Sequence, residues 1–251
     1  MTRIIITGCS GKMGASLINA AAGRDDIEIV GGIDIVEPKN ADFEYAKKFK
    51  ELKCEADVIV DFSNPSVLES MLEYAVEKRV PVVICTTGYN EEQKKKIFAA
   101  SEKIAVFYSG NMSLGINLII ELSKKAAAVF GDGFDVEIVE QHHNQKLDAP
   151  SGTALMIADA ISEVKTDAEY VYDRHSYRKK RDKKEIGIHS IRGGNIVGEH
   201  EVIFAGQDEV LTISHSARSK TVFAVGALNA ASYLKGKAAG MYNMSDLLKN
   251  S

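Results

Sequence analysis

Residues 3–14 read RIIITGCSGKMG, and this stretch decides how the N-terminal half folds. A short β-branched run ends at Gly8, and apolar residues then recur at helical spacing from Ala15 to Ala22. This order predicts a buried strand, a glycine-rich turn and a helix. Glycines stand at positions 8, 11 and 14, and Ser10 replaces the middle glycine of the commoner G-x-G-x-x-G pattern.

Each glycine of this turn has a physical role in binding a dinucleotide. Gly8 permits the tight turn, Gly11 lets the backbone approach a pyrophosphate, and Gly14 lets the helix pack on the strand. The first amides of the helix then face the anion. A second strand, residues 27–33, ends in Asp34, 20 residues past Gly14. A carboxylate there can accept hydrogen bonds from both ribose hydroxyls, whereas a plain glycine turn would need no such acid.

The residues around Asp34 favour NADH over NADPH. The charge of Asp34 repels a 2′-phosphate, and the next residue is Ile35 rather than an arginine that could bind this phosphate. Binding of NADPH remains an alternative, because the nearby Lys39 could pair with the 2′-phosphate.

Strands continue to alternate with helices beyond Asp34. We expect strands over 57–62, 80–85 and 104–108, with helices over 65–74 and 91–101, which together make a Rossmann-type parallel sheet. Two of these strands run into Cys85-Thr86-Thr87-Gly88 and Ser109-Gly110-Asn111-Met112. Strand ends of this kind border the ligand crevice of an open sheet, so both loops can contact the nicotinamide. Ordinary turn chemistry would explain their composition equally well.

The pattern changes after residue 113. A helix over 114–130 is followed by a strand around Val139, a helix from Leu155, and then residues that alternate with period two. Gly193-Gly194-Asn195 reads as a hairpin turn within a mixed or antiparallel sheet, and 222–234 as a final helix. We therefore expect a second, α+β domain. Its histidines 189, 200 and 215 read as sheet or interface residues, and its basic run 178–184 as a solvated flexible loop.

Composition excludes several classes of protein. The 251 residues carry a net charge of −4, which argues against nucleic-acid binding. The chain has three widely spaced cysteines, no apolar run of transmembrane length and no signal-peptide pattern at its start. We expect a cytoplasmic protein with free thiols that binds no membrane.

Residues 140–154, EQHHNQKLDAPSGTA, link a strand to a helix. They indicate where the substrate that accepts the hydride of the dinucleotide would bind. His142 and His143 can exchange protons near neutral pH, and Lys146 can hold a carboxylate or donate a proton. Ser151 is a good N-cap, so Gly152 and Thr153 would present amides to an anion. These residues describe a pocket for a small dicarboxylate. A metal site that also used Glu140 and Asp148, or a surface loop without chemistry, remain alternatives.

Residues 140–154 resemble the signature of the dihydrodipicolinate reductase (4-hydroxy-tetrahydrodipicolinate reductase) family, which serves the diaminopimelate route to lysine. Further similarities follow in order along the chain: the glycine turn, Thr86-Thr87-Gly88, residues 111–117, and Arg192-Gly193-Gly194 with Gly198-Glu199-His200. Cys85 and Ser109-Gly110 depart from the residues usual in the family, but they remove no side chain that the chemistry needs.

The resemblance implies a fold, a reaction and an assembly. It implies a dinucleotide-binding domain over 1–112 and 219–251, and a substrate-binding domain over 113–218 whose sheet builds a homotetramer. It implies that NADH or NADPH reduces the cyclic substrate with loss of water, giving tetrahydrodipicolinate. His142 and Lys146 would donate protons, His143 would bind substrate, and Gly152 and Thr153 would hold a carboxylate. Cofactor contacts would fall on Gly8, Cys9, Ser10, Gly11, Lys12, Met13, Asp34, Cys85, Thr86, Thr87, Ser109, Gly110, Asn111 and Met112.

Two other functions fit part of the sequence. One is a different Rossmann reductase of a small acid, such as an amino-acid dehydrogenase, and the other is an inactive nucleotide sensor. The histidine-lysine loop disfavours the first. Intact His142, Lys146, Gly152 and Thr153 disfavour the second, because a sensor needs none of them.

Overall fold

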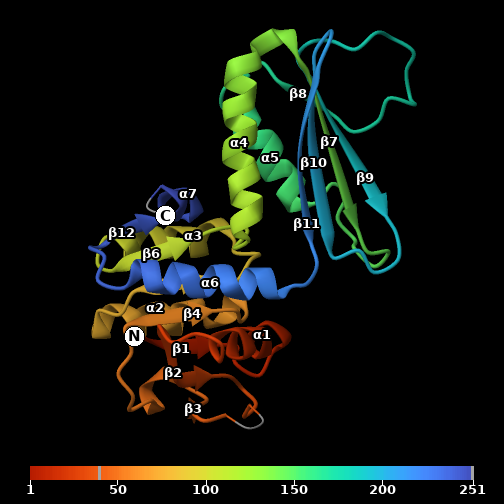
Figure 1. The fold of residues 1–251 in the computed structure, drawn as a ribbon. Helices are drawn as coiled ribbons and strands as arrows, with labels where there is room; N and C mark the ends of the chain where they lie inside the picture. The colour runs from red at the N-terminus through yellow and green to blue at the C-terminus, as the bar shows by residue number, and fades with distance from the viewer. Residues whose placement is uncertain (39–40, 250–251) are drawn as a thin grey trace. The chain divides into compact units, whose positions relative to one another are not determined.

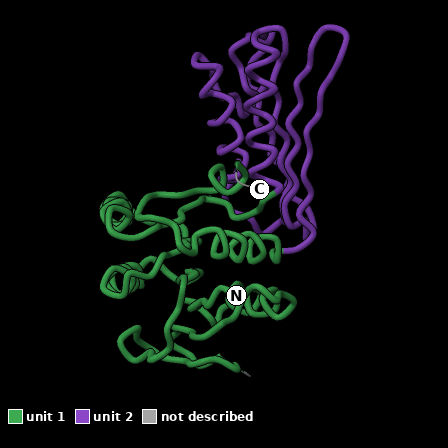
Figure 2. The backbone as a smooth tube through the Cα atoms, turned by 60° about the vertical axis from the view of Figure 1, so that its left-hand side comes forward, with its two compact units in different colours: residues 1–114, 220–251 green, residues 115–219 purple. Residues whose placement is uncertain are grey.

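A computed structural model describes residues 1–38 and 41–249, so Lys39 lies outside the described residues. The chain forms two compact units, coloured separately in Figure 2: Met1–Leu114 with Lys220–Ser251, and Gly115–Ser219. Each unit has its own sheet and its own core. Within the described ranges, no helix combines the length and the apolar character that crossing a membrane requires.

The first unit contains a seven-stranded sheet in the order β12-β6-β5-β4-β1-β2-β3, and every pairing in it is parallel. The sequence thus predicted its Rossmann-type, parallel α/β character correctly. Its strands are β1 (Thr2–Thr7), β2 (Ile27–Ile33), β3 (Glu44–Ala46), β4 (Val58–Asp61), β5 (Val82–Ile84), β6 (Ala105–Tyr108) and β12 (Gly240–Tyr242). Its helices are α1 (Lys12–Ala21), α2 (Leu68–Lys78), α3 (Glu91–Ser101), α6 (Thr221–Leu234) and α7 (Met244–Leu248), with short 3-10 turns η1 (Phe49–Glu51) and η2 (Pro65–Val67).

Helices cover both faces of this sheet. Successive residues of a strand point to opposite faces, and β1 supplies Ile4 and Ile6 to one core and Ile5 to the other. The first core includes side chains of α1, α6 and α7, and the second includes side chains of α2 and α3. Burial on both faces explains why these strands read as continuous apolar runs.

The second unit contains a five-stranded mixed sheet in the order β11-β10-β7-β9-β8. Its strands are β7 (Asp135–His142), β8 (Glu169–Val171), β9 (Glu185–Arg192), β10 (Gly198–Ala205) and β11 (Val210–Ala217). Helices α4 (Leu114–Phe130) and α5 (Gly152–Ser162) pack on one face of this sheet (Figure 1), and the 3-10 turn η3 (Gly131–Gly133) follows α4. Alternate residues of β7, such as Val136 and Ile138, are buried in the core beneath the helices.

The hairpin predicted at Gly193-Gly194-Asn195 is wrong. β9 and β10 are not neighbours, because β7 lies between them, parallel to β9 and antiparallel to β10. The turn instead crosses the end of β7, where the Gly193 amide donates to the His142 carbonyl at 2.9 Å. The hairpin of this sheet joins β10 to β11. The residues of the turn indicate that the chain reverses direction there, but not that another strand, β7, lies between the two strands that the turn connects.

Some short elements and one loop also differ from expectation. Among the described residues, the strands absent from the sequence prediction are β3, β8 and β12, each of three residues and too short for a periodic signal. The short helix α7 and the 3-10 turns η1 and η3 were not predicted either. The basic run 178–184 is only partly solvated, because Arg181 forms ion pairs with Asp135 and Glu137.

Candidate functional site

The glycine-rich turn joins β1 to α1 in the first unit. Gly8 has a φ of 79°, and a Cβ there would lie 2.4 Å from the Phe62 carbonyl oxygen. A Cβ on Gly14 would lie 2.2 Å from the Gly8 oxygen and 2.6 Å from the Cys9 oxygen. Gly14 therefore lets α1 pack on the backbone of the turn itself, immediately after the strand. Gly11 is the N-cap of α1 and provides no side-chain cap, so the helix start keeps amides for an anion.

Asp34 is bound to the same turn. One carboxylate oxygen accepts the Ser10 amide at 2.9 Å, and the other accepts the Ile35 amide at 2.7 Å. The Ser10 hydroxyl donates to the Val36 carbonyl. The oxygen that accepts the Ile35 amide also accepts the Val36 amide at 3.5 Å. A carboxylate has about four acceptor positions, so capacity for ribose hydroxyls remains. Asp34 thus couples the end of β2 to the start of α1.

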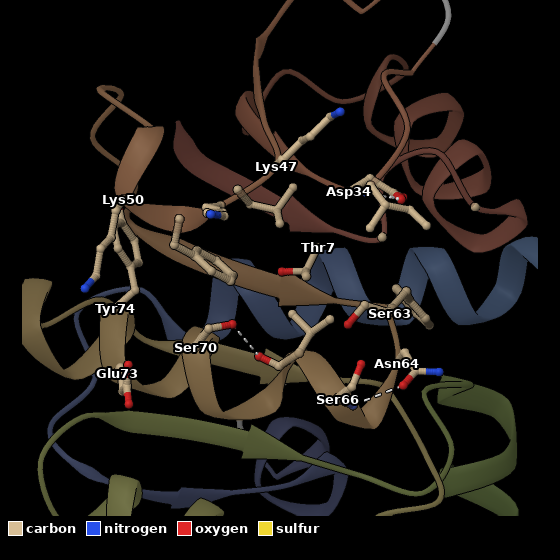
Figure 3. A pocket seen from close by; sticks show the side chains of 18 of the residues that line it. Thr7, Asp34, Lys47, Lys50, Ser63, Asn64, Ser66, Ser70, Glu73 and Tyr74 are labelled. Atoms are coloured by element: carbon tan, nitrogen blue, oxygen red, sulfur yellow. Dashed lines mark hydrogen bonds between the residues drawn. The ribbon is translucent and has the colours of Figure 1, made fainter.

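A cleft of about 1000 Å³ opens at the carboxyl ends of these strands, within the first unit (Figure 3). Of the predicted cofactor residues, Gly8, Gly11 and Asp34 line it, and Cys9, Ser10, Lys12 and Met13 belong to the adjoining turn and helix start. Lys47 and Lys48 also line it, and the sequence did not single them out. Ile33 of β2 pairs with Ala46 of β3, which sets Lys47 beside Asp34 at one sheet edge. No periodic signal marks so short a strand.

The predicted nicotinamide-side loops follow β5 and β6, outside the lining of this cleft. The Thr86 hydroxyl accepts the Ser63 amide at 2.8 Å, which joins the ends of β5 and β4. Burial raises the pKa of Cys85 well above its ordinary value, so this thiol is inert. The Ser109 hydroxyl donates to the Asn111 carbonyl at 2.9 Å across Gly110, and Met112 is buried in the core.

The predicted proton donors lie in the second unit. His142 ends β7 and is buried, and its Nδ1 is 2.6 Å from Oε2 of the fully buried Glu140. Lys146 lies on the following loop, and its Nζ forms an ion pair with Asp148 at 3.0 Å. The Lys146 amide donates to the His143 carbonyl at 3.1 Å, so the loop folds back on itself.

The predicted substrate-binding residues flank the same loop. His143 follows His142 directly, and Gly152 and Thr153 are the first two residues of α5. Ser151 is the N-cap, and its hydroxyl accepts the Ala154 amide at 3.1 Å. The loop therefore places two histidines and a lysine between the end of a strand and the start of a helix, as the sequence order indicates.

Burial and charge set the protonation of this cluster. Burial opposes ionisation of Glu140, but hydrogen bonds from Arg192 and His142 outweigh it and lower its pKa to about 2. Burial lowers the pKa of His142, and Glu140 offsets this only in part. Burial, with repulsion from His142, lowers the pKa of His200 to about 4. At neutral pH the cluster holds one carboxylate and two neutral imidazoles.

Arg192 and His200 are parts of this cluster that sequence reasoning missed. Arg192 binds Glu140 through both terminal nitrogens, at 2.6 and 2.8 Å. His200 lies 3.1 Å from the Ser151 hydroxyl, and its ring centroid is 5.3 Å from that of His142. Their signal is the strand register, which pairs Arg192 with His142 and His200 with Glu140. In the part of the chain that the structure describes, no three His, Cys, Asp or Glu side chains converge as metal ligands.

Comparisons with known proteins match both units of the chain to one family. The family described as "Dihydrodipicolinate reductase, N-terminus" matches residues 2–112, and "Dihydrodipicolinate reductase, C-terminus" matches residues 115–248. The chain belongs to the dihydrodipicolinate reductase family. The 4-hydroxy-tetrahydrodipicolinate reductase of Caldanaerobacter subterraneus subsp. tengcongensis is 52% identical, covering 99% of each chain. That of Clostridium tetani is 48% identical, covering 100% of this chain and 98% of the relative.

A solved member of the family has the same fold. The dipicolinate-bound dihydrodipicolinate reductase from Paenisporosarcina sp. TG-14 superposes with a TM-score of 0.80 at 25% identity, over 97% of each chain. The resemblance seen in residues 140–154 is confirmed, and the chain is an oxidoreductase of a family that uses a nicotinamide cofactor.

Proposed function

We propose that this chain reduces 4-hydroxy-tetrahydrodipicolinate to tetrahydrodipicolinate in the diaminopimelate route to lysine. The substrate takes up one hydride and one proton and loses one water. The observation that carries the proposal is 52% sequence identity over 99% of the chain to a reductase of this name, with the signature loop 140–154 intact. The alternatives, an amino-acid dehydrogenase and a nucleotide sensor, lack an observation that favours them.

We assign the proton steps to the loop of the second unit. Loss of the substrate hydroxyl as water needs a proton from a donor, and the neighbouring carbon releases one as the double bond forms. Addition of hydride to this double bond then needs one proton at the neighbouring carbon, so the net uptake is one hydride and one proton. We assign His142 and Lys146 as the two donors, because an imidazolium and an ammonium can each give a proton to a substrate within hydrogen-bond reach. The ion pair of Lys146 with Asp148 shows that this ammonium engages a carboxylate.

We assign substrate binding to His143, Gly152 and Thr153. The start of α5 attracts an anion through its amides and helix dipole, and the ring of His143 would bind a second carboxylate. The related structure from Paenisporosarcina is described as dipicolinate-bound, and dipicolinate is a cyclic dicarboxylate. This agreement in chemistry supports a dicarboxylate pocket in residues 113–218, the substrate domain that we propose.

We assign the cofactor to the first unit, in a domain over 1–112 and 219–251. A nicotinamide dinucleotide supplies the hydride when bound. The absence of a Cβ at Gly8 and Gly14 fits the close backbone turn that holds a pyrophosphate, and Asp34 has capacity for ribose hydroxyls. We place the enzyme in the cytoplasm, where Cys9, Cys54 and Cys85 would remain the free thiols that they are in this fold.

We propose that NADH is preferred and that NADPH is tolerated. Asp34 repels a 2′-phosphate, but Lys47 beside it carries an opposing charge. Asp34→Asn should raise KM for NADH about tenfold and lower KM for NADPH, because a ribose acceptor and a repulsive charge are lost together. Lys47→Ala should raise KM for NADPH alone. Parallel titrations with both cofactors check this, and equal responses to the two variants would contradict it.

The decisive test is turnover of the natural substrate. A dihydrodipicolinate synthase should generate the substrate in the cuvette, and oxidation of NADH and NADPH should be followed separately by absorbance. We expect turnover with both and a higher kcat/KM with NADH. No turnover with either cofactor rejects the function, while clear preference for NADPH rejects only the assignment of Asp34.

A further inference from the structure

One buried carboxylate joins the two ends of the signature loop. Glu140 is fully buried on β7, and its Oε2 lies 2.6 Å from Nδ1 of His142, where the loop begins. Its Oε1 accepts the Ser151 amide at 3.1 Å, where the loop ends. The same side chain therefore fixes the imidazole and closes the base of the loop.

Arg192 holds this carboxylate in place. Its terminal nitrogens lie 2.8 Å from Oε2 and 2.6 Å from Oε1, a bidentate pairing that fixes the plane of the carboxylate. A third contact runs from Arg192 to the Asp148 carbonyl at 2.7 Å, within the loop itself. A buried carboxylate is costly unless it is paired, so Arg192 accounts for an ionised Glu140 at this position.

An ionised Glu140 determines which nitrogen of His142 carries the proton. A carboxylate only accepts hydrogen bonds, so Nδ1 of His142 must be the donor at 2.6 Å. Nε2 is then left for chemistry, and among the described residues no hydrogen bond engages it. A Cβ on Gly198 would lie 3.1 Å from Nε2, so the glycine keeps space open beside this nitrogen.

We propose that Glu140, clamped by Arg192, is the positioning residue for proton transfer by His142. It fixes the Nδ1–H tautomer, directs Nε2 to the open side at Gly198, and stabilises the imidazolium that carries the proton. Nε2–H of that imidazolium passes its proton to the substrate, and the imidazole returns to its neutral Nδ1–H form. This inference rests on the proposed function, because it concerns the donor in that reaction.

Several charged and titratable groups surround His142, and they define the sign of the expected pH effect. Glu140 favours the imidazolium, whereas Lys146 and Arg192 disfavour it, and Lys146 is itself paired with Asp148. His200, on the neighbouring strand β10, is neutral at pH 7 because burial lowers its pKa to about 4. Removal of the Glu140 charge therefore lowers the pKa of His142. The alkaline limb of kcat, where a proton donor loses its proton, moves to lower pH.

Glu140→Gln tests this with Glu137→Gln as a matched control. Glu137 lies on the same strand and also contacts a histidine, His189, at 2.8 Å and two arginines, but it points to the opposite face of the sheet. We expect Glu140→Gln to lower kcat at pH 7 at least tenfold, shift the alkaline limb to lower pH and leave KM for NADH within twofold. Glu137→Gln should keep the wild-type profile.

A wild-type kcat and an unshifted limb in Glu140→Gln would overturn the proposal. Inactive wild-type enzyme would instead reject the proposed function. If Glu140→Gln fails to fold, nitrogen-15 NMR of the wild-type imidazoles decides, with His142→Gln to assign the signal. The proposal requires the proton of His142 on Nδ1 at neutral pH, and a proton on Nε2 overturns it.

Discussion

Lys146 is the residue whose replacement best separates chemistry from cofactor binding. It lies in the second unit, while every predicted cofactor contact lies in the first. Lys146→Ala should therefore lower kcat about 100-fold or more, the usual range for losing a positioned acid, and leave the Kd for NADH near the wild-type value. Initial rates with saturating NADH and a fluorescence titration of NADH measure the two effects.

Lys124→Ala is the control for this substitution. Lys124 also forms an ion pair, with Glu163, on the surface of the same unit but on α4 rather than on the signature loop. An exposed pair of this kind contributes little, so activity should stay within twofold. Full turnover in Lys146→Ala would remove Lys146 from the proposed proton step.

His200 makes the stability of the protein sensitive to acid. Burial lowers its pKa from 6.5 to about 4. Between these two pH values the unfolded chain binds a proton at His200 and the folded chain does not. Stability is therefore complete above pH 6.5 and is lost as pH falls from 6.5 toward 4. One pKa unit corresponds to about 1.4 kcal/mol, so the loss by pH 4 is on the order of 3 kcal/mol.

His200→Gln should remove this part of the pH dependence. Glutamine can keep a hydrogen bond to the Ser151 hydroxyl, which lies 3.1 Å from His200, but it does not titrate. Urea unfolding of both proteins at pH 7 and pH 5 gives the comparison, and other groups cancel in the difference. Equal losses of stability in the two proteins would show that His200 is protonated in the folded state.

Among the elements, those with long periodic runs could be predicted, and those defined by distant partners could not. Helices α3 and α4 begin and end at the predicted residues, and β2 also agrees. The insertion of β7 between β9 and β10 could not be foreseen, because pairing depends on which apolar faces meet in the core. For the same reason the pairing of Arg192 with Glu140 could not be predicted, since these two residues are 52 positions apart in the sequence.

In the turn between β1 and α1, one added methyl group should harm both the stability of the protein and its binding of NADH. A Cβ on Gly14 would lie 2.2 Å from the Gly8 carbonyl oxygen, which is backbone and cannot rotate away. Gly14→Ala should lower the free energy of unfolding by about 2 kcal/mol or more and weaken NADH binding at least tenfold. Denaturant titration and NADH fluorescence measure these effects.

Gly23→Ala is the matched control for the same chemical change. A Cβ on Gly23 would meet nothing within 4 Å, so stability should stay within about 0.5 kcal/mol of the wild type. A stable Gly14→Ala protein with wild-type NADH affinity would show that α1 can shift off the turn, and that close packing there is not required.

For the whole molecule, the open face of the five-stranded sheet is the surface that we expect to build the homotetramer. Helices α4 and α5 cover one face, while the other carries Val139, Ile191 and Ile203 among polar side chains, a mixture common at interfaces. The particle should therefore have four times the 27.3 kDa mass of the chain in light scattering after size exclusion.

Ile191→Asp, which adds a charge at a half-exposed apolar position, should shift the particle to smaller species. Phe98→Asp makes a similar change on α3 of the first unit and should leave the mass unaltered. A monomeric wild type, or a tetramer that tolerates Ile191→Asp and dissociates with Phe98→Asp, would place assembly elsewhere.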